Sequence, residues 1–337
     1  RESDLILGTF GRAAWVLDDL RPLREIAKGN LNTTSITAFD SPEAVHAEFM
    51  VSDGIRFQGD AAFKGENRPA GARMRVYLSD LPDKVKKPLK IDIYDSSGAS
   101  LRHIERELDS SDAGLYSYIW DLCERGVRGP RFGKINKKNN KSDPRGALVK
   151  PGTYKVRFSF DGGSDSTMIK VVDDPRRILD DGEWDSGILF RRSLHKPTKA
   201  LTEVVTRLYE VKESIEAFEK LLKLRTKNDT SLFKNSLKKI KAFKKKIEDE
   251  RIKLFGKNDI KRGYFEQPET WTYIDRQFKS YLWQMSGKPT PNIMSIHNLW
   301  LEKTESATKR VENLLDNEWL NLSDELKAEF PNDIFPK

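Results

Sequence analysis

A run of lysines marks the segment KNSLKKIKAFKKKIEDERIK, which begins at residue 234. On a helix, Lys238, Lys241 and Lys245 share one side, and Lys244 and Lys246 belong to the same run, so basic side chains face away from the apolar residues. We interpret this side first as a solvated face whose long side-chain stems shield a helical bundle. The alternative is a polyanion-binding surface for acidic glycan or lipid phosphate. Nucleic acid is a disfavoured ligand, because the aromatic residues of this segment lie on its apolar face and are not interleaved with the lysines on the basic face.

Two tyrosines are candidates for contact with glycan. Tyr77 and Tyr94 lie in segments of alternating polarity, on the face opposite the aliphatic residues, so we expect both to be exposed to solvent. Three other aromatic residues, Tyr116, Tyr118 and Trp120, share one face of a single strand, and we interpret them as core packing.

Other reactive residue types lack the spacing that catalysis or metal binding requires. The four histidines (His46, His103, His195 and His297) are far apart in the sequence, and carboxylate pairs such as Asp18-Asp19 are adjacent, which is typical of turn capping. Cys123 is interpreted as a buried structural thiol. The sequence therefore predicts no catalytic residue, no metal ligand and no cofactor site.

Composition indicates a polar, multidomain globular chain. The 337 residues carry a net charge of +8, with 37% hydrophobic and 33% charged residues. A single cysteine excludes an internal disulfide. No stretch approaches the roughly 18 apolar residues of a membrane span. The first residue is Arg rather than Met, so we expect further chain upstream.

Residues 40–175 have the sequence pattern of a β domain. GARMRVYL, LKIDIYDSSG, GLYSYIWDL and GTYKVRFSFDGG are short alternating segments separated by turns, with no helical pattern between them. This spacing predicts an antiparallel β-sandwich. The basic insertion over residues 125–150 is interpreted as a mobile loop, with a binding finger as the alternative.

Residues 176–337 change to a helical period. Apolar residues recur at intervals of three and four over residues 201–222, 233–247, 271–285 and 293–314. Four amphipathic segments predict an antiparallel four-helix bundle. Because such an apolar helix face can also pack against a helix of another chain, a protein partner or a homo-oligomer is an open alternative.

The first segment, DLILGTFGRAAWVLDD, predicts a hairpin over residues 4–19, with two apolar runs on either side of a turn at Gly11. A two-stranded hairpin alone is marginal in water and needs further strands or a packed layer. We expect further strands to complete it, and an edge hairpin docked on the sandwich is the alternative. Residues 1–39 are therefore assigned to a terminal hairpin and linker.

The order of these segments resembles the C-terminal portion of bacterial sortilin-like, BNR-repeat β-propeller proteins. The hairpin is similar to the closing strands of the last propeller blade, and GENRPAGARMRVYL through VKPGTYKVRFSFDG look like the immunoglobulin-like domain that follows, of the flagellar hook-capping type. DDPRR matches the passage into a helical tail. No Asp-box of the form Ser-x-Asp-x-Gly-x-x-Trp is present, so no catalytic residue is carried over.

The resemblance implies a non-catalytic accessory and interaction region that contacts the upstream propeller of the same chain. It also implies an extracytoplasmic setting: secreted, periplasmic or at the cell surface. Two alternatives stay open: accessory modules of a propeller glycoside hydrolase whose catalytic carboxylates lie upstream, and a polyanion-binding module that uses the lysine-rich helix.

Overall fold

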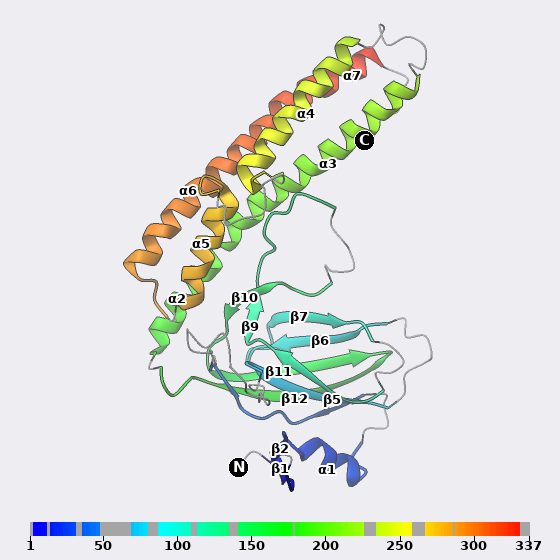
Figure 1. Ribbon diagram of the computed structural model, residues 1–337. Coiled ribbons are helices and arrows are strands. Elements are labelled where there is room, and N and C mark those ends of the chain that lie inside the picture. The colour runs from blue at the N-terminus through cyan, green and yellow to red at the C-terminus, as the bar shows by residue number, and fades with distance from the viewer. Residues whose placement is uncertain are drawn as a thin grey trace. The chain divides into compact units, whose positions relative to one another are not determined.

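The structure is a computed structural model. It describes residues 3–11, 14–31, 36–47, 69–79, 87–108, 113–134, 141–177, 179–225, 234–257, 267–285 and 287–330. The chain divides into two compact units: Arg1–Gly126 with Lys137–Asp180, and Val127–Asn136 with Asp181–Lys337. The first unit is built mainly of β-strands and the second of helices (Figure 1).

The strands of the first unit, with one short helix, are β1 (Leu5–Gly8), β2 (Ala14–Leu17), α1 (Arg21–Ala27), β3 (Ile36–Phe39), β4 (Ala44–Val45), β5 (Ala72–Leu78), β6 (Leu89–Tyr94), β7 (Ser100–Arg106), β8 (Gly114–Trp120), β9 (Cys123–Arg125), β10 (Arg145–Leu148), β11 (Gly152–Phe160) and β12 (Gly163–Val172). One sheet has the order β4-β12-β11-β6-β7 and another has the order β3-β5-β8. Strands β1 and β2 form a separate pair, as do β9 and β10.

The core of the β unit follows from strict alternation along its strands. In β5, Ala72, Met74, Val76 and Leu78 are buried while the residues between them are partly exposed. The alternate residues Ile91 and Ile93 of β6, with Val156 and Phe158 of β11, join the same apolar cluster. The strands themselves were therefore predictable from the period of two.

The predicted hairpin of β11 and β12 is confirmed, with Phe160 opposite Gly163, but the predicted antiparallel immunoglobulin-like sandwich is wrong. The five-stranded sheet is mixed, because β4 runs parallel to β12 with Ala44 opposite Val171. The described residues form neither an immunoglobulin-like sandwich nor a propeller blade, since β1 and β2 pair only with each other. Alternation identifies which face of a strand is buried, but it does not specify the neighbour with which that strand pairs.

The helices of the second unit are α2 (Asp181–Ser193), α3 (His195–Arg225), α4 (Lys234–Phe255), α5 (Trp271–Gln284), α6 (Pro291–Asn313), the π-helix η3 (Leu314–Trp319) and α7 (Leu320–Glu329). Thr270 and Thr290 cap α5 and α6 by accepting hydrogen bonds from the amides of Tyr273 and Ile293. Helix α6, η3 and α7 follow one another without a break (Figure 1).

The predicted four-helix bundle is also wrong. The apolar residues of this unit form two clusters. One joins α3 and α4 to α6, η3 and α7. The other joins α5 and the start of α6 to Phe190 of α2 and to Leu194, which follows α2. Helices α4 and α5 thus follow each other along the length of the helical unit and do not lie side by side (Figure 1). The sequence predicted four helices packed side by side. Instead, the apolar faces of α4 and α5 pack one after the other along the same neighbouring helices, so three helices rather than four lie side by side.

Part of the basic insertion belongs to the helical unit. Phe132 packs against Tyr209 of α3 and Phe255 of α4, and the Thr202 hydroxyl donates to the Arg128 carbonyl at 2.9 Å. The chain leaves β9 at Gly126, where a Cβ atom would lie 2.2 Å from the Arg145 carbonyl oxygen. The interpretation as a mobile loop does not fit residues 127–134, which pack on the helices. Residues 135–140 lie outside the described residues.

Candidate functional site

The lysines of α4 separate into two groups with different surroundings. Lys238, Lys241 and Lys245 are exposed, and so is Lys234, which helical spacing places beside them. Their positions four, three and four residues apart place all four on one side of the helix, and we call them the lysine stripe. Among the described residues, no carboxylate lies within ion-pair distance of the lysine stripe.

The other lysines of the run pair with acidic residues on neighbouring helices. Lys244 lies 2.8 Å from Glu219 of α3, and Lys246 pairs with Glu318 of the π-helix. Lys239 pairs with Glu325 of α7 at 2.6 Å. The hydrogen bond and charge of Glu325 raise the pKa of Lys239 above its ordinary value. Two of the five predicted binding lysines, Lys244 and Lys246, are therefore engaged in holding helices together.

The predicted glycan-facing tyrosines lie on different sheets. Tyr77 is on β5 of the three-stranded sheet and Tyr94 is on β6 of the five-stranded sheet, and both are half-buried. Strand pairing does not bring them onto one platform. Tyr116 and Tyr118 stack on each other and pack against the core, and Trp120 is buried. Glycan contact by Tyr77 and Tyr94 stays a prediction.

The hairpin of β1 and β2 is exposed on both faces. Ile6 pairs with Val16 on one face, and Leu5 with Leu17 and Leu7 with Trp15 on the other. All six apolar side chains are exposed, with Ile6 at 68% and Trp15 at 64%. The turn between the strands carries the exposed Phe10. So large an apolar surface on so short a ribbon is unusual for a water-facing element.

Two arginines of β5 attach the end of this hairpin to the β unit. The Arg75 guanidinium donates to the carbonyls of Asp18 at 2.7 Å and Asp19 at 3.2 Å. Arg73 forms an ion pair of 2.7 Å with the Asp18 carboxylate. Asp19 is buried, has a φ of 56°, and accepts a 2.6 Å hydrogen bond from Arg21. The alternating Arg-x-Arg of β5 is the sequence signal for this attachment, which sequence reasoning missed.

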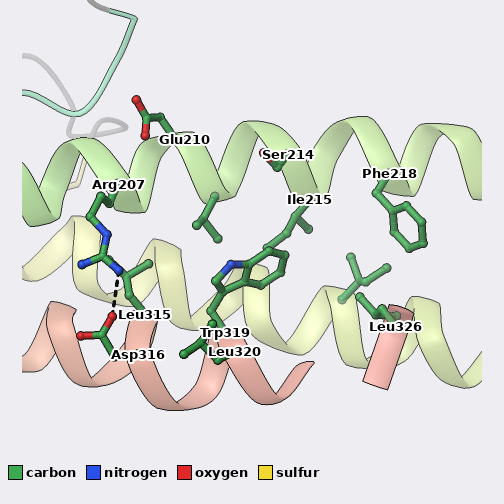
Figure 2. Close-up of a pocket in the computed structure, with 12 residues that line it drawn as sticks. Arg207, Glu210, Ser214, Ile215, Phe218, Leu315, Asp316, Trp319, Leu320 and Leu326 are labelled. Atoms are coloured by element: carbon green, nitrogen blue, oxygen red, sulfur yellow. Dashed lines mark hydrogen bonds and ion pairs between the residues drawn. The ribbon is translucent and has the colours of Figure 1, made fainter. Parts of the chain in front are cut away.

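A groove lies between α3 and the π-helix (Figure 2). Its volume is about 330 Å³, and the buried Ile215, Ile240 and Leu315 contribute to its apolar lining. An ion pair of 2.8 Å between Arg207 and Asp316 lies at its edge, shown by the dashed line in Figure 2. π-Helical turns occur often at functional sites. This lining suits an apolar side chain, and it includes no histidine or cysteine.

His103, Ser142 and Cys123 each contact neighbouring groups of the β unit. His103 lies between Asp92, at 2.6 Å, and Glu105, at 3.5 Å, on the five-stranded sheet. The Ser142 hydroxyl bonds to the backbone of Glu105. Cys123 is buried as predicted, and burial raises the pKa of its thiol to about 11, so it is a poor nucleophile at neutral pH.

Among the described residues, no group of three or more histidine, cysteine, aspartate or glutamate side chains is placed to hold a metal ion. None of the described helices combines the length and the apolar character that crossing a membrane requires.

Comparison with known proteins identifies no family. No family model matches the chain, and no curated protein matches it. A solved structure, the crystal structure of dimeric latent PorU from Porphyromonas gingivalis, aligns at 20% identity with a TM-score of 0.19. The alignment covers 31% of this chain and 8% of the PorU chain. A likeness this weak carries no argument about fold or function.

Proposed function

We propose that this chain is a non-catalytic interaction region whose exposed hairpin is completed by β-strands of a neighbouring sheet. The observation that carries the proposal is the exposure of apolar side chains on both faces of the β1–β2 ribbon. Among the described residues, β1 and β2 pair only with each other, so both edges of the ribbon are open and offer backbone groups to a further strand. Addition of strands to an open edge is a common mode of recognition.

The attachment of the hairpin supports the same proposal. Arg73 and Arg75 hold Asp18 and Asp19 against β5, so the ribbon begins from a defined place on the β unit. Charge-assisted hydrogen bonds of this kind are stronger than neutral ones. A ribbon that is held at its base and exposed along its length is suited to pairing with a sheet outside the unit.

The resemblance of residues 4–19 to sortilin-like, BNR-repeat proteins is the second support. It implies that the additional strands lie upstream in the same chain, and it implies an extracytoplasmic setting. The relation to that family is part of the proposal. The upstream part of the same chain is therefore the first partner to test.

Site-directed photo-crosslinking in the full-length gene product tests the proposal. A benzophenone amino acid is placed at Ile6 or Val16, and for comparison at Met168, an apolar residue of β12 that is 54% exposed but belongs to a paired sheet. We expect efficient crosslinks from Ile6 and Val16 to strand segments, identified by mass spectrometry, and a low yield from Met168. Equal yields at the three positions would overturn the proposal.

A second variant separates pairing from mere proximity. Ile6→Thr with Val16→Thr removes apolar contacts from one face while keeping residues that favour strands. We expect crosslinking from a benzophenone amino acid at Leu7, on the opposite face, to fall as the ribbon loses its partner strands. Unchanged crosslinking from Leu7 would show that the apolar face contributes nothing to the interaction.

A further inference from the structure

The lysine stripe concentrates positive charge along a straight line. Lys234, Lys238, Lys241 and Lys245 lie within an arc of roughly 60° on α4, and the first and last are about 16 Å apart along the axis. All four side chains are exposed. The exposed residues in the same stretch of helix are polar apart from Ala242.

The paired lysines explain why no described carboxylate on the neighbouring helices forms an ion pair with the stripe. Lys244 lies on one flank of the stripe and binds Glu219, whereas Lys239 and Lys246 lie on the other flank and bind Glu325 and Glu318. Glu219, Glu318 and Glu325 of the neighbouring helices are thus engaged by lysines that flank the stripe. Within the part of the chain that the structure describes, an external anion meets the four ammonium groups of the stripe without displacing an ion-pair partner.

We propose that the lysine stripe binds a linear acidic polysaccharide that carries sulfate or carboxylate groups. A lysine ammonium group is a point charge with three donors, and it binds such oxygens without requiring the planar, paired geometry that arginine provides. A flexible linear chain can place successive anionic groups along a line about 16 Å long. The inference is independent of the proposed role of the hairpin, because it concerns the other unit of the protein.

Two other polyanions fit the stripe less well. Peripheral membrane helices combine basic residues with apolar side chains that enter the lipid, and no large apolar side chain is exposed on α4 within the described residues. Proteins that bind single-stranded nucleic acid place aromatic side chains beside the basic groove. On α4 the aromatic residues are Phe243, which is buried, and Phe255, which packs against Phe132.

Heparin chromatography and direct titration with heparin test the proposal in the full chain, with two variants of equal charge. The stripe variant is Lys238→Gln, Lys241→Gln and Lys245→Gln. The control variant is Lys239→Gln, Lys244→Gln and Lys246→Gln, which removes the same charge from paired positions. Circular dichroism and thermal unfolding establish that each variant is folded before binding is compared.

We expect the stripe variant to elute at lower salt, with affinity about tenfold weaker and a shallower dependence on salt, because fewer ions are released on binding. The control variant is expected to keep affinity within about twofold, because its lysines are already paired. Equal weakening of both variants would show an effect of net charge alone and would overturn the assignment to the stripe, as would unchanged binding of the stripe variant.

Parallel titrations identify the class of polyanion. Vesicles containing phosphatidylserine and single-stranded DNA are measured at the same salt concentration, with the same two variants. Heparin is expected to bind more tightly than either. Tighter binding of the vesicles or of the DNA, with loss in the stripe variant alone, would overturn the polysaccharide and assign the stripe to a membrane or to nucleic acid.

Discussion

Phe132 and Tyr209 meet edge to face, with ring centroids 5.4 Å apart and ring planes at 88°. This geometry is the favoured one for an aromatic pair. It joins the segment that leaves β9 to helix α3, and Phe255 of α4 completes the contact at a centroid distance of 6.4 Å. The helical unit therefore includes a segment from the middle of the β-rich half of the sequence.

Phe132→Ala is expected to destabilise the helical unit by about 1–2 kcal/mol, because a half-buried ring loses both aromatic neighbours. Urea unfolding followed by circular dichroism at helical wavelengths measures the change. Arg131→Ala, at the exposed neighbouring position, is the matched control and should change stability by less than about 0.5 kcal/mol. Equal effects of the two variants would contradict a packing role for the ring.

Thr304→Val is expected to cost about 1–3 kcal/mol, although its side chain keeps nearly the same shape. The Thr304 hydroxyl is fully buried and accepts a 2.9 Å hydrogen bond from the indole nitrogen of Trp271. Valine removes that acceptor and leaves a buried donor without its partner. The free energy of unfolding in urea measures the loss.

Thr308→Val is the control for this experiment. Its hydroxyl donates to the Thr304 carbonyl at 2.8 Å and, among the described residues, accepts no hydrogen bond from another side chain. Removing it leaves that carbonyl in its helical environment, so the cost should be clearly smaller than for Thr304→Val. A larger loss in Thr308→Val would mean that the hydroxyls stabilise the helix locally rather than through Trp271.

Local patterns in the sequence predicted the elements better than their arrangement. The alternation of Met74, Val76 and Leu78 correctly identified β5, and the period of apolar residues correctly identified α3 and α4. Arrangement depends on contacts between distant residues, such as Val171 with Ala44, which no local period encodes. The assignment to a sandwich and a four-helix bundle failed for this reason.

In the candidate sites, too, local relationships were predictable from the sequence and long-range contacts were not. Helical phase correctly placed Lys238, Lys241 and Lys245 on one side of α4, because that relationship is local. Which lysines are free depends on Glu219, Glu318 and Glu325 of other helices, and this could not be derived from a single helix. The attachment of Asp18 to Arg73 is likewise a long-range contact.

Arg75→Met is expected to loosen the base of the hairpin, because the carbonyls of Asp18 and Asp19 lose their charged donor. The amides of Asp19 and Leu20, which donate to Asp4 and Ser3, should exchange hydrogen about tenfold faster or more. Arg157→Met, on the exposed face of β11, is the control. If Arg157→Met speeds exchange equally, the effect is one of global stability rather than of local attachment.

The stability of the β unit should fall as the pH drops from about 6.5 to about 4. Burial lowers the pKa of His46 to about 4; the Asp173 carboxylate opposes this shift and the Arg177 charge adds to it. In the unfolded chain His46 has its ordinary pKa, so below about pH 6.5 the unfolded state binds a proton that the folded state does not. Stability therefore decreases with falling pH across this window and is unaffected by His46 above it.

The expected loss is about 3 kcal/mol across the whole window, from 1.36 kcal/mol per pKa unit. Hydrogen exchange of the Val156 amide in β11, corrected for the intrinsic pH dependence of exchange, measures it. His46→Leu removes this titration, so the difference between the two proteins should grow steadily as the pH falls below about 6.5. Parallel pH profiles for the protein and for His46→Leu would show that His46 takes up its proton equally in both states, and hence that its burial does not oppose protonation.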